Sequence, residues 1–166
     1  GLEDLPTGIY ALTVPVVDTA TLEGARRAGL SVQPLAGSTH YLSVTPGRTA
    51  VPVGPGLVAL QPIAGNVAWM DLTHTEVGDS TMTLLAAMPH LSRLRLSGTK
   101  VTDAGLERLK GLRYLEYLNL VDTDVSDAGL RALEAMPLLR SVHLWGTRAT
   151  EGGVARLQRA LPHAAI

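Results

Sequence analysis

The chain of 166 residues contains no cysteine and no phenylalanine. Without cysteine, the chain has no disulfide framework, no thiolate site for zinc or an iron–sulfur cluster, and no attachment point for a covalent haem. The absence of phenylalanine beside an apolar fraction of 46% predicts an almost wholly aliphatic interior. Such an interior suits a stack of similar layers filled by leucine, valine, methionine and alanine.

An excess of charge and long apolar runs are lacking as well. Lysine and arginine number 14 and aspartate and glutamate 15, which gives a formal net charge of -1. Because the two signs are interleaved, we expect no nucleic-acid partner. No apolar run reaches the roughly 18 residues of a membrane span, since the stretch 56–70 is interrupted by Gln61, Pro62 and Asn66. We therefore expect no membrane insertion by this chain.

The length of the chain and its first residue indicate how it is organised. A chain of 166 residues is long enough for one domain with one continuous core. It begins at Gly1 without methionine and without a charged and then apolar leader, so we expect a portion of a longer protein.

The second half of the chain repeats itself every 24 residues, in four copies that begin at Val67, Leu91, Leu115 and Leu139. Self-similarity at this period, with leucines spaced as L-x-x-L-x-L, is typical of a solenoid whose units bury their apolar faces against each other. The apolar columns are Met70, Leu94, Leu118 and Val142; Leu72, Leu96, Leu120 and Leu144; and Leu85, Leu109, Leu133 and Leu157.

Each repeat is predicted to hold one short strand and one helix. The run 94–96 alternates apolar and polar residues as a strand does, and the segment 102–106 has the composition of a helix start. The column Thr102, Ser126 and Thr150 is predicted to cap the helices. The acids in the next column lie in the first helical turn, where the positive end of the helix dipole stabilises a carboxylate. Glycines recur in the same turn, where they let adjacent helices approach. The acidic column is Asp79, Asp103, Asp127 and Glu151, and the glycine column is Gly105, Gly129 and Gly153, with Thr81 in the first unit.

Residues 1–66 do not keep the period and are predicted to form an N-terminal cap of mixed structure, while residues 67–166 form the repeats and the C-terminal cap. A strand is expected over 8–17, and a helix capped by Asp18 or Thr19 should end at Gly29. Strand-like runs follow at 30–32 and 41–44, then a helical turn over 57–63. Residues 164–166 are predicted to begin another strand.

The segment 94–106, LRLSGTKVTDAGL, resembles bacterial leucine-rich repeats of the T-x-V-T-D-A-G-L type, and 118–130 is nearly as similar. The resemblance covers residues 67–161 and implies an α/β solenoid with a concave parallel sheet and convex helices. In place of the usual asparagine after the strand stand Thr75, Thr99, Thr123 and Thr147, which predicts a ladder of hydroxyls. More faintly, residues 20–66 resemble the segment before such repeats in membrane-attached bacterial proteins that also carry a c-type cytochrome domain. That similarity implies an extracytoplasmic or periplasmic location, with any haem elsewhere; a cytoplasmic location stays open.

The positions between the strand leucines point out of the concave sheet and differ from copy to copy. Both tryptophans of the chain fall there with a tyrosine and two arginines, types that are enriched at binding hot spots. The alternative is that tryptophan only covers an end of the sheet. The predicted partner-binding residues are Trp69, Asp71, Arg93, Arg95, Tyr117, Asn119, His143 and Trp145, and the outer row is Thr73, Ser97, Val121 and Trp145.

Catalytic, metal and cofactor sites are not predicted. Asp71 and His143 lie three strands apart, roughly 14 Å at about 4.8 Å per strand, which is too far for a hydrogen bond. We expect Asp71 to form an ion pair with Arg95 on the neighbouring strand instead. Ser97 and Ser141 lack a positioned histidine with an orienting carboxylate. The run 122–127 resembles a cation loop but has neither the glycine nor the distal glutamate of one. The five histidines show no zinc spacing.

The sequence thus predicts a non-enzymatic module that binds a protein partner, or another domain of its parent protein, on the concave face. The alternative is a structural accessory subunit or rigid spacer of an extracytoplasmic, membrane-associated and electron-transferring complex. Such a subunit would dock through the irregular N-terminal segment.

Overall fold

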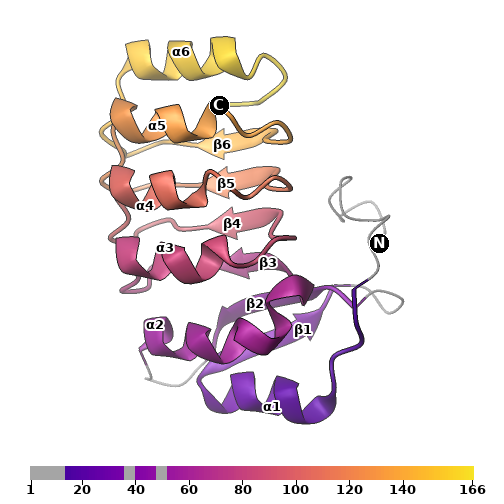
Figure 1. Ribbon diagram of the computed structural model, residues 1–166. Coiled ribbons are helices and arrows are strands. Elements are labelled where there is room, and N and C mark those ends of the chain that lie inside the picture. The colour runs from indigo at the N-terminus through magenta and orange to yellow at the C-terminus, as the bar shows by residue number, and fades with distance from the viewer. Residues whose placement is uncertain (1–13, 36–39, 48–51) are drawn as a thin grey trace.

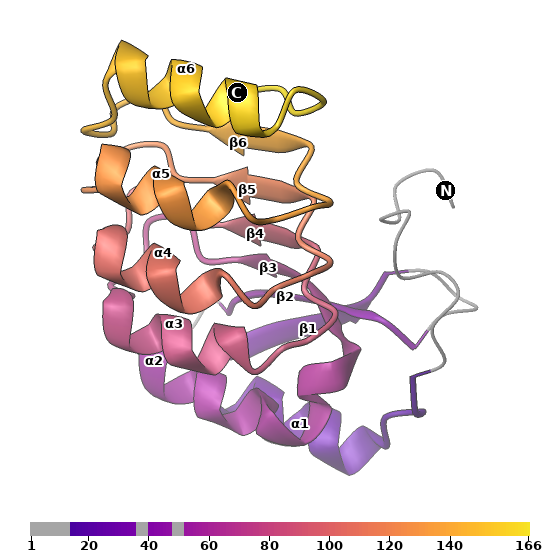
Figure 2. The same cartoon turned by 45° about the horizontal axis from the view of Figure 1, so that its top comes forward.

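The computed structural model describes residues 14–35, 40–47 and 52–166. Figure 1 shows a stack in which the strands form one sheet and the helices α3 to α6 lie one above another beside it. The described strands pair in chain order, β1-β2-β3-β4-β5-β6. Turning the molecule shows that the helices all lie in one layer along one side of the sheet (Figure 2). The fold is an α/β leucine-rich-repeat solenoid, as the sequence predicts.

The four repeats each contribute one strand and one helix. Their strands pair in parallel with a register of one full repeat, so that Met70 lies beside Leu94, Leu94 beside Leu118, and Leu118 beside Val142. The elements are β3 (Val67–Asp71), α3 (Asp79–Ala86), β4 (Arg93–Arg95), α4 (Asp103–Leu109), β5 (Tyr117–Asn119), α5 (Asp127–Leu133), β6 (Ser141–His143) and α6 (Glu151–Ala160).

The elements before the repeats are α1 (Thr19–Arg27), β1 (Leu30–Pro34), β2 (Leu42–Pro46), α2 (Val53–Gly56) and the 3-10 helix η2 (Leu57–Asn66). Asp18 caps α1 through a bond from the backbone N–H of Thr21, and Gly29 follows the helix with φ 87°, as predicted. The strand predicted at 8–17 is not found over 14–17, and residues 8–13 lie outside the described part.

The sheet is parallel through the repeats, as predicted, and mixed only at its N-terminal edge. β2 joins β3 in parallel, but β1 pairs antiparallel with β2, so the sheet is mixed at this edge. The reason is the short connection between β1 and β2, because a parallel pair needs a crossover of about a dozen residues or more.

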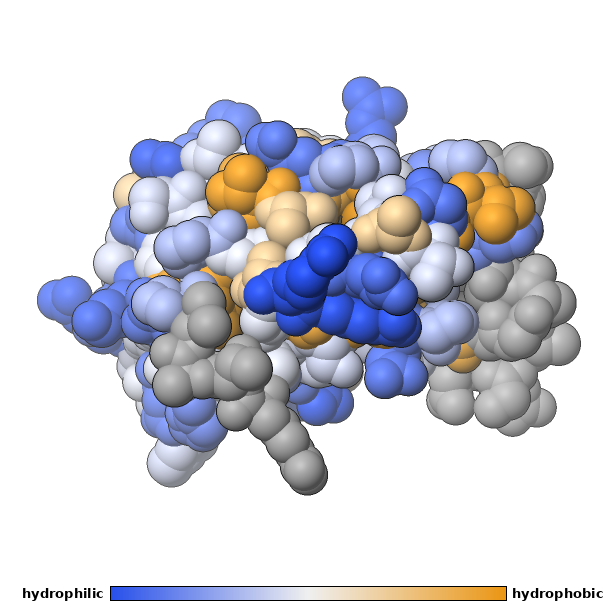
Figure 3. All heavy atoms as spheres, turned by 90° about the horizontal axis from the view of Figure 1, so that it is seen from below, coloured by the Kyte–Doolittle hydropathy of each residue, from blue (hydrophilic) through white to orange (hydrophobic). Residues whose placement is uncertain are grey.

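Seen from below, this end of the molecule shows a strongly hydrophilic central patch between separate hydrophobic areas (Figure 3).

The main core is an aliphatic cluster that runs from Ala25 in α1 to Ala164 near the C-terminus. The strand leucines Leu94, Leu96, Leu118 and Leu120 have no exposed surface, nor do Leu106, Leu109, Leu130 and Leu133 of the helices. Full burial of such a side chain stabilises the fold by about 1.5–3 kcal/mol. Near the C-terminus, where another strand is predicted to begin, Ala165 forms a single isolated parallel bridge with Ser141 of β6.

The acidic and capping columns connect each repeat to the next. Asp103 accepts two hydrogen bonds from Ser126, the N-cap of the following helix: its Oδ1 accepts the backbone N–H at 2.7 Å and its Oδ2 the hydroxyl at 2.6 Å. Asp79 holds Thr102 in the same way, and Asp127 holds Thr150. We call these three pairs the Asp clamps. From the sequence, these acids are expected to interact with the positive end of their own helix dipole. In the structure, each of the three aspartates also binds the N-cap residue of the next repeat.

The glycine column leaves room for the clamps. A Cβ at Gly129 would lie 2.4 Å from Oδ1 of Asp103, and one at Gly153 would lie 2.0 Å from Oδ1 of Asp127. The carboxylate of the preceding repeat thus excludes any side chain at the glycine position. Thr81 is tolerated in the first unit because Pro55, not an acid, stands 26 residues earlier, at the spacing that separates Gly129 from Asp103.

The threonine column forms no ladder between repeats. Each hydroxyl donates instead to the carbonyl of the leucine three residues earlier, as from Thr99 to Leu96 at 2.6 Å and from Thr123 to Leu120 at 2.7 Å. A threonine hydroxyl is too short to reach the next repeat, so it closes its own turn instead.

Candidate functional site

The concave face carries the predicted side chains in the predicted order. Trp69 lies opposite Arg93, Arg93 opposite Tyr117, and Tyr117 opposite Ser141. The second row runs from Asp71 through Arg95 and Asn119 to His143. These residues face outward because the alternate positions of the strands are leucine, methionine and valine that fill the core.

A groove of about 240 Å³ lies on this face over β2 to β5. Five of the eight predicted partner-binding residues line it, namely Trp69, Asp71, Arg93, Arg95 and Tyr117. Asn119, His143 and Trp145 lie outside the groove. Its wall also contains Ser43 and Thr45 of β2, which the sequence analysis missed because β2 precedes the first repeat. We call this concavity the β2–β5 groove.

Arginines in the β2–β5 groove lie over aromatic rings. Cζ of Arg93 lies 4.5 Å from the ring centroid of Trp69, and Cζ of Arg95 lies 5.8 Å from that of Tyr117. Both distances are within the range of a cation–π interaction. Arg95 also forms the predicted ion pair with Asp71, at 3.4 Å between Nη1 and Oδ2.

The two tryptophans differ in environment. Trp145 is 77% exposed, so it does not cover the end of the sheet. Trp69 is half-buried and packs against a small cluster formed by Val14, Tyr41 and Ala68. Burial, together with the neighbouring Tyr114, raises the pKa of Tyr41. The predicted role of tryptophan as a cover is therefore met in part by Trp69, while Trp145 is a free apolar side chain.

One serine of the concave face has a histidine neighbour but no orienting carboxylate beside it in the described part of the chain. Oγ of Ser141 lies 3.2 Å from Nε2 of His143, so this serine does have a histidine within hydrogen-bond distance. The pair arises because residues two apart in a strand share one face. In the described part of the chain, no carboxylate is bonded to His143, whose other contact is the Tyr117 ring at 5.2 Å between centroids. Asp71 and His143 are separated by two intervening strands, as predicted.

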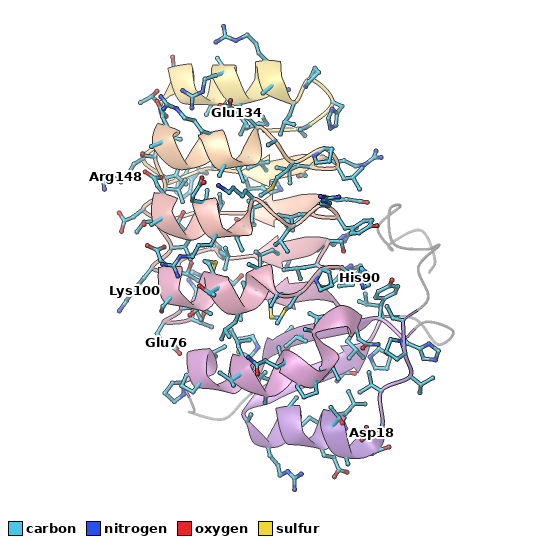
Figure 4. The ribbon with its side chains drawn as sticks, in the orientation of Figure 1. Asp18, Glu76, His90, Lys100, Glu134 and Arg148 are labelled. Carbon is cyan, nitrogen blue, oxygen red and sulfur yellow. The ribbon has the colours of Figure 1, made fainter. Side chains whose placement is uncertain are left out.

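The acid-rich loops have structural partners. Hydrogen bonds from the backbone N–H and the hydroxyl of Thr150 lower the pKa of Asp127. The pKa of Glu76 is lowered by its own backbone N–H and also by those of Gly54 and Val53, with Lys100 adding to the effect. Figure 4 places Glu76, Lys100 and Arg148 on one side of the solenoid and His90 on the other.

The residues at 76, 100, 124 and 148 form a column of alternating sign: Glu76, Lys100, Asp124 and Arg148. Among residues 14–35, 40–47 and 52–166, no three side chains of histidine, aspartate or glutamate are grouped to hold a metal ion. In the same ranges no helix has the length and apolarity to cross a membrane.

Comparison with protein families identifies the repeat in the middle of the chain. A family model described as Leucine Rich repeat matches residues 87–110 and 111–133, which is less than half of the chain. A leucine-rich-repeat protein of Leptospira interrogans is similar in structure, with a TM-score of 0.46 and 16% identity over 64% of this chain and 33% of that chain. The chain thus spans about a third of that protein's length. No curated protein matches. Domains with this repeat generally mediate protein–protein interaction, and no enzymatic family is indicated.

Proposed function

We propose that this protein is a recognition module that binds a protein partner, or another domain of its parent protein, on its concave face. The observation that carries the proposal is the β2–β5 groove, because it concentrates two aromatic rings and two arginines on a preformed sheet. Aromatic and arginine side chains dominate binding energies at interfaces, and repeat solenoids use their concave surfaces for binding.

Trp145 extends the surface beyond the groove. Its ring is 77% exposed at the end of the sheet formed by β6, next to the half-exposed Leu144. A large exposed indole is a suitable apolar anchor for a partner, since it gains contact area at little entropic cost. The proposed interface thus has a charged part at the groove and an apolar part at Trp145, joined by Asn119 and His143.

The test replaces Trp69, Tyr117 and Trp145 together with alanine and compares capture of partners from a native extract. We expect the triple variant to lose specific partners while retaining the helical signal and cooperative unfolding of the parent. A matched control replaces Glu107, Arg131 and Arg159, which are exposed residues of the convex helices, with alanine. Recovery of the same partners by the triple concave variant would refute the proposal.

The accessory role and the extracytoplasmic location remain proposals that rest on the resemblance of residues 20–66. Asn66 bears on the test, because its side chain donates to the carbonyls of Pro15 and His40 at 2.7 and 2.9 Å. Removal of residues 1–40 would therefore disrupt the fold itself. Removal of residues 1–13 deletes none of the described elements, since α1 begins at Thr19. If that variant loses its partners while the concave face is unchanged, the accessory role is favoured.

A further inference from the structure

The charges of the β2–β5 groove do not balance. Arg93 and Arg95 stand against the single carboxylate of Asp71, which leaves one net positive charge. Asp71 is already engaged: its Oδ1 accepts from the backbone N–H and the hydroxyl of Thr73 at 3.0 and 2.6 Å, and its Oδ2 contacts Arg95. Asp71 is therefore held by its own turn and by one of the two arginines, and the other arginine remains unmatched.

The unmatched cation is Arg93. Its guanidinium lies over the Trp69 ring, and in the described part of the chain it has neither an ion pair nor a hydrogen bond. The contact with the ring satisfies none of the five N–H donors of the guanidinium, and these donors match the two oxygens of a carboxylate. Because the ring already fixes the side chain, little further rotamer entropy is lost when an anion binds. Arg93 is thus a preorganised donor without an acceptor.

The rest of the groove fits a small anionic group. Ser43 lies opposite Trp69 in the sheet, so the row Ser43, Trp69, Arg93 and Tyr117 crosses four strands. The hydroxyls of Ser43 and Thr45 add donors to the wall. A volume of about 240 Å³ is below that of a site for a drug-sized ligand, which is about 300–1,000 Å³. It suits a single side chain.

We propose that the β2–β5 groove binds an aspartate or glutamate side chain from an acidic segment of the partner, with Arg93 as the bidentate donor. This inference rests on the proposed function and names the chemistry of its partner. A nucleic acid is the less fitting source of anions, because the chain has a formal net charge of -1 and Asp71 stands in the groove.

The experiment uses a peptide of eight glutamates as probe and the indole signals of the full chain in a ¹⁵N–¹H spectrum as readout. The chain has two tryptophans, and Trp69→Phe assigns their signals. The buried indole N–H of Trp69 has no acceptor in the described part, so its signal is free of competing hydrogen-bond changes. We expect the Trp69 signal to shift saturably with octaglutamate and to stay unchanged with octaglutamine.

Variants identify the residue responsible. Arg93→Gln should weaken the octaglutamate response about tenfold or more, since a charged hydrogen bond is lost. Arg93→Lys should weaken it less, because the charge remains while the bidentate geometry is lost. Arg131→Gln, on the convex side, should leave it unchanged.

Three results would overturn the inference: no shift of the Trp69 signal at millimolar octaglutamate, an equal response from Arg93→Gln, or tighter binding of an eight-nucleotide single-stranded DNA. The proposed function is judged separately, by the partner capture with the triple alanine variant. If octaglutamate fails and the triple variant still loses its partners, the concave face binds by another chemistry. If octaglutamate binds and the triple variant keeps its partners, the groove is an anion site outside the main interface.

Discussion

The two sides of each repeat differ in how their residues are used. At the helix starts, the four copies carry nearly the same residues, and each contact joins a repeat to its neighbour through the Asp clamps. On the concave face, the copies carry Trp69, Arg93, Tyr117 and Ser141 at one position of the strand. Repetition therefore marks the residues that hold the stack together, and divergence marks the surface on which specificity can be built.

Two adjacent residues of β5 give the largest contrast. Leu118 is fully buried, so Leu118→Ala should reduce the free energy of unfolding by about 3 kcal/mol through lost burial and a cavity. Tyr117 faces the groove and is half-exposed, so Tyr117→Ala should cost about 1 kcal/mol or less. Urea unfolding monitored by circular dichroism measures both. Equal losses would contradict the division between the two faces.

The glycine column allows a test in which one substitution changes from destabilising to stabilising, depending on the residue beside it. Gly153→Ala should destabilise the fold by about 2 kcal/mol, because the new Cβ would lie 2.0 Å from Oδ1 and 2.3 Å from Cγ of Asp127. The three heavy atoms nearest to that Cβ all belong to the Asp127 side chain. In an Asp127→Ala background the same change should stabilise the helix by up to about 1 kcal/mol, as alanine is the better helix former. A double-mutant cycle of unfolding free energies measures the coupling, and additive effects would exclude it.

Loss of an Asp clamp should lower the free energy of unfolding less than loss of a core leucine does, but more than loss of an acid that binds no neighbouring repeat. Asp103→Ala removes two hydrogen bonds to Ser126, and we expect a loss of about 1–2 kcal/mol. The matched control is Glu151→Ala, which changes the same column in α6 and should cost about 0.5 kcal/mol through the helix dipole alone. Thermal unfolding of the two variants compares them directly. A larger loss for Glu151→Ala would contradict the clamp.

The smallest effect expected is a pH dependence at Asp127. Its pKa is lowered in the folded state, chiefly by the backbone N–H of Thr150, so its stabilisation is fully present above the unfolded value near 3.8. That stabilisation is lost as the pH falls through the lower folded value. Asp127→Asn should therefore be less stable than the parent at neutral pH, and the difference should shrink below about pH 3.8. Unfolding midpoints across this range test it, and a constant difference would argue against the assignment.

Much of this division could be predicted from the sequence because a fixed period places equivalent residues side by side. The 24-residue spacing alone put Asp71 beside Arg95 and predicted their ion pair. It also identified Thr102, Ser126 and Thr150 as helix caps, and the structure confirms all three. Local rules were sufficient for Asp18 and α1, since an N-cap depends only on the residues that follow it.

Contacts outside the period could not be predicted. Ser43 and Thr45 reach the groove because β2 pairs with β3 across a register shift between Leu42 and Ser43, which no repeat signals. The targets of the Asp clamps were missed because the spacing gives columns but not which side chain reaches the next repeat.

A further column was also overlooked, at 74, 98, 122 and 146. Gly98 and Gly146 there have positive φ, as expected for glycine, but His74 and Asp122 share the conformation with φ 55°. Their side chains lie over the glycine of the next repeat, where a Cβ would come within 2.2 Å of Nδ1 of His74 or 2.1 Å of Oδ1 of Asp122.

The central claim is that binding resides on the divergent concave face. Its most direct test places a photocrosslinking amino acid at Asn119, between the groove and Trp145, or at Glu107 on the convex helix α4. In native extract, we predict a discrete crosslinked partner from position 119 that disappears when Trp69, Tyr117 and Trp145 are replaced by alanine, and none from position 107. A partner captured from position 107, or one from position 119 that survives the triple replacement, would contradict the claim.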